Sequence, residues 1–138
     1  MTYVRDTNAG RSIRAIVIMR GKRHVATVQA HYGASRVTVN VWHTDGTPVQ
    51  QARASGYGYD KFTAALSGLT IDGHRLTDHC GESRKPPRGA TVWPSDAKPP
   101  RGWRFANYSA DLGGYTDCYR LPGLEYLEAI GYSVINAI

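Results

Sequence analysis

The sequence predicts an α+β fold, in which an antiparallel meander sheet of four to five strands is covered on one face by two short helices. Three observations predict it. Apolar and polar residues alternate through the first half of the chain, two later segments carry apolar residues at helical spacing, and residues 82–104 are too rich in proline for a helix or a central strand. The chain of 138 residues has the size of one domain. We therefore treat residues 1–138 as a single α+β domain with a long basic, proline-rich loop or insertion at residues 82–104.

The first half of the chain is expected to form strands joined by hairpin turns. The β-branched first strand ends at Gly21-Lys22, a plausible tight turn, and the third strand has valines on one face and polar or aromatic residues on the other. Asp45-Gly46 gives the strongest hairpin signal, and Pro48 is confined to the start or the edge of the return strand. The four strands are expected over residues 12–20, 24–32, 36–43 and 48–54.

Two helices and a last strand are expected later in the chain. Asp60 suits the beginning of the first helix and Gly68 its end, with an apolar stripe between them that can cover the valine face of the sheet. Pro122 can open a second helix, which continues over residues 124–130. Residues 132–138 then predict a strand that joins the N-terminal sheet.

The proline-rich segment contains the sequence Lys-Pro-Pro-Arg-Gly twice, at residues 85–89 and 98–102. Proline pairs favour extended backbone, and long ordered loops are often functional. Cations alternate there with aromatic residues, the composition that holds phosphates while bases stack. The alternative is that the arginines are only solvated and the tryptophans attach the loop to the core. The basic residues are Arg84, Lys85, Arg88, Lys98, Arg101 and Arg104, and the aromatic ones are Trp93, Trp103 and Phe105.

A second candidate site is the glycine-tyrosine turn at residues 56–61, between a strand and a helix. Glycines allow a ligand to approach the backbone, tyrosines can stack on a base, and Lys61 can contact a phosphate. The alternative is that the tyrosines pack the corner of the fold. A third, weaker cluster combines Asn107 and Tyr108 with Asp117, Tyr119 and Arg120, which could read a base edge or cap a loop. The candidate ligand-binding residues are Tyr57, Gly58, Tyr59, Lys61, Arg88, Arg101, Trp103, Arg104 and Asn107.

The net charge of +6 and the pI of about 9.5 favour a partner that carries phosphate, although many basic proteins are basic for solubility alone. Asp78-His79-Cys80 contains the residue types of a catalytic triad, but residues adjacent in the chain cannot fold back on one another to form one. Neither a Gly-x-Ser-x-Gly elbow nor a phosphate-binding loop is present. The spacing of His74, His79, Cys80 and Cys118 matches no compact zinc pattern. We therefore expect neither an enzyme nor a bound metal or cofactor.

The chain has no apolar run long enough for a membrane span and no signal-peptide pattern. We expect a protein without a membrane partner, in the cytoplasm, with two free thiols.

The segments 54–66, 71–73 and 78–81 resemble a pattern in small proteins encoded by phages and prophages, in which a Gly-Tyr-Gly-Tyr-Asp-Lys turn leads into an Ala-rich helix. The resemblance covers residues 12–81. Some phage proteins of this size and layout resemble the anti-Thoeris sponges, which are oligomers that sequester nucleotide immune signals without cleaving them. No pocket residue of that family can be carried over to this sequence.

The resemblance implies a non-catalytic counter-defence protein in the host cytoplasm, a homo-oligomer that sequesters a cyclic ADP-ribose isomer or a cyclic oligonucleotide. Its expected partner is an anionic, nucleotide-type small molecule. The alternative is an inhibitor of a CRISPR effector or another host nucleoprotein, with the basic loop on RNA or on an acidic protein face. A third hypothesis is a small nucleotide-directed enzyme that uses His79 or Asp60 as acid or base.

Overall fold

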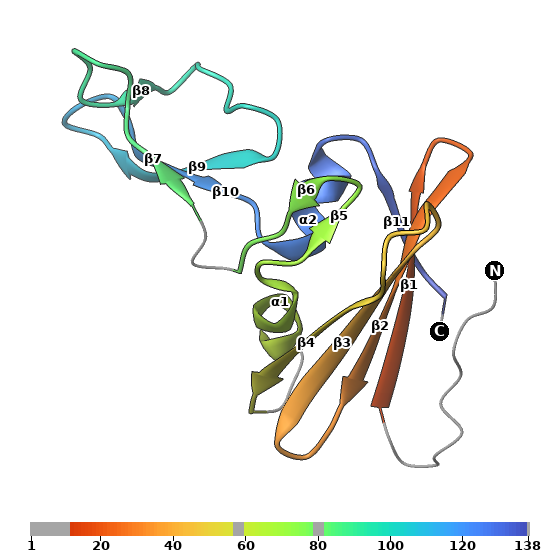
Figure 1. The fold of residues 1–138 in the computed structure, drawn as a ribbon. Helices are drawn as coiled ribbons and strands as arrows, with labels where there is room; N and C mark the ends of the chain where they lie inside the picture. The colour runs from red at the N-terminus through yellow and green to blue at the C-terminus, as the bar shows by residue number, and fades with distance from the viewer. Residues whose placement is uncertain (1–11, 57–59, 79–81, 138) are drawn as a thin grey trace.

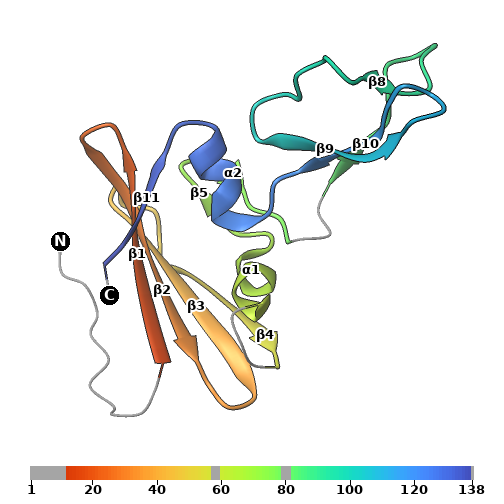
Figure 2. The ribbon, with the colours of Figure 1, turned by 180° about the vertical axis from the view of Figure 1, so that it is seen from behind.

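The computed structural model describes residues 12–56, 60–78 and 82–137, and it confirms the predicted α+β class (Figure 1). A five-stranded sheet and two helices form the larger part of the molecule. A smaller sheet, built from residues 83–120, projects from it (Figures 1 and 2). The described part of the chain contains no helix with the length and apolar character that a membrane crossing requires.

The large sheet has the strand order β11-β1-β2-β3-β4, and every neighbouring pair is antiparallel. The two-residue turn after β1 contains Gly21 at a φ of +61°, a conformation that glycine adopts without strain. The C-terminal strand β11 pairs with β1, so the two ends of the described chain meet at one edge of the sheet. The strands are β1 (Ser12–Arg20), β2 (Arg23–Tyr32), β3 (Arg36–His43), β4 (Gln50–Ser55) and β11 (Ser133–Asn136).

The core lies between this sheet and the helices α1 (Asp60–Leu66) and α2 (Gly123–Ala129). Alternation along β3 directs three valines, Val37, Val39 and Val41, into the core with no exposed surface. Leu66 of α1 and Leu127 of α2 are equally buried and belong to the same cluster, so both helices pack on this one face (Figure 2).

The connections differ in detail from the sequence predictions. The loop from β3 to β4 has six residues, and β4 begins at Gln50, so Pro48 lies in the loop. Thr47 N–H donates to the Asp45 carboxylate at 2.9 Å, which shapes this loop. The segment after α1 forms a small hairpin of β5 (Thr70–Ile71) and β6 (His74–Arg75). Its turn, Asp72-Gly73, has positive φ at both residues, as a tight hairpin turn requires.

The small sheet is centred on β10 (Gly114–Arg120), which has β9 (Trp103–Ser109) along one side. The short strands β7 (Ser83–Arg84) and β8 (Trp93–Pro94) pair with its other side. The prediction that residues 82–104 form an extended loop throughout was therefore incomplete. This segment contains two short strands and the beginning of a third because its backbone finds partners on β10, which follows it in the chain.

Candidate nucleic-acid interface

The two Lys-Pro-Pro-Arg-Gly repeats fold into the same kind of turn. The carbonyl of Pro87 accepts a hydrogen bond from Ala90 N–H at 2.9 Å, and the carbonyl of Pro100 accepts one from Trp103 N–H at 3.0 Å. The glycine of each turn has a positive φ, +88° and +87°. This geometry places glycine at the third position, as a type II turn requires, and leaves the arginine before it exposed.

The surroundings of the two repeats are different. Gly102 is buried, and a Cβ atom there would lie within 2.7 Å of the Tyr126 ring, so the second turn packs closely on α2. The turn is also held by Leu121 N–H, which donates to the Gly102 carbonyl at 2.8 Å. A Cβ atom on Gly89 would meet no atom of the described residues within 4 Å. The predicted Arg88 thus lies on an open turn, whereas Arg101 lies beside the larger part of the molecule.

Aromatic rings form a continuous row in the small sheet. Trp93 stacks on Phe105 with 5.4 Å between ring centroids, and Phe105 stacks on Tyr115 at the same separation. Tyr115 meets Tyr108 edge to face at 5.3 Å. The first three rings are half-buried, but Tyr108 is 55% exposed. The row therefore fixes the shape of the small sheet and ends in an accessible ring.

One cation of the small sheet lies against an aromatic ring, and another is the cross-strand partner of a tyrosine. The guanidinium of Arg84 is 4.1 Å from the centroid of the Trp103 ring, so this side chain already occupies one face of the predicted Trp103. Arg104 pairs with Tyr119 across β9 and β10, and both residues are exposed. Neighbouring cationic and aromatic side chains of this kind suit a phosphate and its base.

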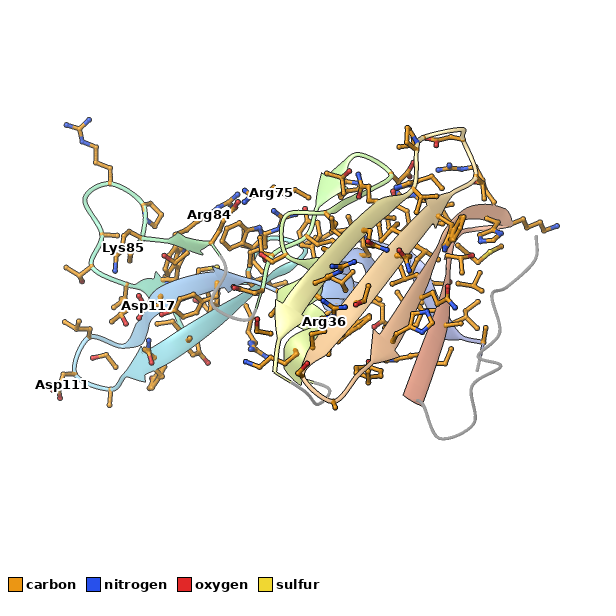
Figure 3. All side chains as sticks on the ribbon, turned by 60° about the horizontal axis from the view of Figure 1, so that its bottom comes forward. Arg36, Arg75, Arg84, Lys85, Asp111 and Asp117 are labelled. Carbon is orange, nitrogen blue, oxygen red and sulfur yellow. The ribbon has the colours of Figure 1, made fainter. Side chains whose placement is uncertain are left out.

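The predicted Asn107 is engaged within the protein. Its side-chain amide donates to the Asp117 carboxylate at 2.5 Å, and the Thr116 hydroxyl donates to the same carboxylate at 2.9 Å. The Lys85 ammonium is 3.5 Å from this carboxylate. Lys85 and Asp117 are labelled in Figure 3. The hydrogen bond from Asn107 is the main cause that lowers the pKa of Asp117. Asn107 also has a positive φ of 61°. In this structure Asn107 therefore orients an ionised carboxylate, and this uses one of the two N–H donors of its amide.

The structure describes only part of the glycine-tyrosine turn at residues 56–61. Tyr57, Gly58 and Tyr59 lie outside the described residues. Lys61 is half-buried, and its Cε atom would be 2.9 Å from a Cβ on Gly56, so its stem crosses that glycine closely. Helix α1 begins at the end of the molecule away from the small sheet (Figure 1). Of the predicted residues, Trp103, Arg104 and Asn107 share strand β9, Arg88 lies on the open turn between β7 and β8, and Lys61 lies on α1.

The β9–β10 hairpin itself was missed from the sequence. Alternation in Trp103–Ala106 and the Gly113-Gly114 pair would have indicated two strands and a turn. Within residues 82–120 the acids are fewer than the cations, and most of the cations precede the hairpin in the chain. The acids are Glu82, Asp96, Asp111 and Asp117, and the cations are Arg84, Lys85, Arg88, Lys98, Arg101, Arg104 and Arg120.

Comparison with known proteins finds no matching family model, no similar curated sequence and no similar solved structure. The resemblance to phage proteins therefore stays a prediction. Among residues 12–56, 60–78 and 82–137, no three His, Cys, Asp or Glu side chains form a group that could hold a metal ion. His79 and Cys80, considered as ligands from the sequence, lie outside those ranges.

Proposed function

We propose that this protein binds single-stranded nucleic acid through the small sheet, without catalysis, in the cytoplasm of a host cell. The observation that supports this function is that strands β9 and β10 carry one exposed arginine, Arg104, and two exposed tyrosines, Tyr108 and Tyr119. Arg104 and Tyr119 are cross-strand partners, and Tyr108 lies further along the same pair of strands.

The physical argument rests on two contributions. A base stacked on an aromatic side chain contributes about 1–3 kcal/mol, and every base offers such a face, so this contact tolerates many sequences. Exposed arginines and lysines add phosphate contacts that release counterions, which makes the affinity depend on salt. A net charge of +6 adds long-range attraction for the same polymer.

The alternative hypothesis from the sequence is an inhibitor that binds the RNA of a host nucleoprotein. This surface agrees better with that hypothesis than with sequestration of a small nucleotide signal. An exposed hairpin presents contacts along a line, whereas a small nucleotide needs groups that surround it. Sequestration of a cyclic nucleotide by a homo-oligomer stays a prediction.

Fluorescence anisotropy with labelled fifteen-residue oligo(U) and oligo(dT) tests the proposal. Arg104→Ala and Tyr119→Ala should each weaken binding about fivefold or more, whereas Tyr119→Phe keeps the stacking ring and should bind like the wild type. Arg36→Ala is the matched control, because Arg36 is an exposed arginine of the large sheet, away from the small one (Figure 3). Affinity should fall linearly with the logarithm of the salt concentration.

Equal effects of Arg36→Ala and Arg104→Ala would show that only the overall charge matters, and they would refute an interface on the small sheet. Native mass spectrometry of freshly expressed protein distinguishes binding of RNA from sequestration of a small nucleotide. A co-purifying RNA supports the proposal, and an intact small nucleotide released from an oligomer supports sequestration instead.

A further inference from the structure

An ion cluster lies where the small sheet joins the rest of the molecule. The Glu82 carboxylate is 3.9 Å from a guanidinium nitrogen of Arg75 and 3.8 Å from one of Arg120. Both distances exceed those of a hydrogen bond, so the single carboxylate is attracted by two guanidiniums and held firmly by neither. About half of the Glu82 side chain, 51%, is exposed.

Arg120 is fixed in position independently of Glu82. Its guanidinium lies 3.9 Å from the centroid of the Tyr126 ring, and its Nη2 donates to the carbonyl of Arg75 at 2.5 Å. The side chain is only 11% exposed. Its Nε–H is buried and has no hydrogen-bond partner among residues 12–56, 60–78 and 82–137. A buried charged donor without an acceptor is unfavourable. The Arg120 Nε–H therefore needs an acceptor, and Glu82 does not supply it.

A third arginine belongs to the same junction. Arg84 follows Glu82 by two residues, and its guanidinium is stacked on Trp103, which pairs with Arg120 across β9 and β10. Figure 3 shows Arg75 and Arg84 on one side of the molecule, where the small sheet begins. Two guanidiniums therefore lie within 4 Å of the Glu82 carboxylate, and a third belongs to the same junction. Stacking on a ring orients Arg84 and Arg120 in advance.

We propose that Arg75, Arg84 and Arg120 form a phosphate site, which Glu82 occupies in the free protein and leaves when a phosphate group enters. A phosphate brings more acceptor oxygens than a carboxylate, and guanidinium forks match it with paired hydrogen bonds. Glu82 thus competes with the ligand. The site deepens the proposed function, because a nucleic-acid phosphate is its expected occupant, but inorganic phosphate tests it separately.

The test is a titration of the full-length protein with inorganic phosphate at constant ionic strength, with chloride as the compensating anion. NMR detection of the arginine Nε–Hε groups follows Arg120 directly. Its resonance should shift in a saturable way, because the buried donor gains an acceptor. Glu82→Gln removes the competing charge and should tighten phosphate binding about two- to fivefold, the range of one partly exposed ion pair.

Arg75→Ala should weaken phosphate binding by a similar factor. Arg75 is 64% exposed, so its removal leaves the fold intact, whereas loss of the buried Arg120 would disturb the junction. Arg36→Ala should leave phosphate binding unchanged.

An unchanged phosphate affinity in Glu82→Gln, together with a lower melting temperature, would show that Glu82 only fastens the junction, and it would overturn the site. A linear, unsaturable shift of Arg120 would also overturn it. Either result would leave oligonucleotide binding by Arg104 and Tyr119 untouched. Saturable phosphate binding without oligonucleotide binding would keep the site and refute the proposed function.

Discussion

Replacing Gly114 by alanine should detach strand β8 from the small sheet and leave the large sheet folded. Gly114 is buried in β10 opposite Pro94 of β8. A Cβ atom there would collide with the carbonyl oxygen of Trp93 and lie 2.9 Å from both its carbonyl carbon and Val92 Cγ2. Because the obstacle is backbone, no side-chain rotation relieves it, and β8 has to move away.

The expected loss of stability follows from the interactions that β8 makes in the small sheet. Detachment breaks its pairing with β10 and the stack of Trp93 on Phe105. A backbone hydrogen bond contributes about 1 kcal/mol net, and an aromatic pair about 0.5–1.5 kcal/mol, so the small sheet should lose about 2–4 kcal/mol. The main hydrophobic core contains no residue of the small sheet, so it keeps its packing.

Near-UV circular dichroism and thermal unfolding measure the effect, since Trp93 lies in the aromatic row. Gly113→Asn is the matched control. Gly113 has a φ of +75°, which asparagine tolerates, and a Cβ there meets no atom of the part of the chain that the structure describes within 4 Å. A Gly114→Ala protein with the near-UV spectrum and melting temperature of Gly113→Asn would refute this reasoning about the contact of β8 with β10.

Three further outcomes are expected. Leu127→Ala should lower the free energy of unfolding in urea by about 2–5 kcal/mol, because Leu127 has no exposed surface; a loss below about 1 kcal/mol would contradict this packing. The Tyr132 hydroxyl donates to Asp72 at 2.5 Å and is the main cause that lowers the pKa of that carboxyl below its ordinary 3.8. The resulting stability is present above the unfolded-state pKa and is lost as pH falls through the folded-state pKa. Tyr132→Phe should therefore cost about 1–2 kcal/mol at pH 7 and progressively less as the pH falls below 3.8, and a loss that does not change with pH would exclude the carboxylate as the cause. Burial raises the pKa of the Cys118 thiol, so in a Cys80→Ser background iodoacetamide should label Cys118 slowly until denaturant is added, and rapid native labelling would contradict its burial.

The interface was only partly accessible from the sequence. Arg104 was identified from the mixture of cations and aromatic residues, which is a property of composition. Glu82, Arg75 and Tyr126 were not singled out, because they come from three separate segments and none has a local signal. Asn107 was identified as a possible base reader, but its partner Asp117 lies ten residues away, and only the hairpin brings them into contact.

The sequence by itself determined the α+β class and the main strands, because local periodicity records which face of each strand is buried. The alternating valines of β3 are the clearest case. Only the tertiary structure decided the small sheet. Strands β7 and β8 have two residues each, too few to show any alternation, and they exist because β10 supplies their hydrogen-bond partners. The same pairing holds Glu82 among the arginines of the junction, since Arg120 N–H donates to the Glu82 carbonyl at 2.9 Å. Contacts between segments far apart in the chain leave no periodic signal within either segment. For this reason only the tertiary structure shows them.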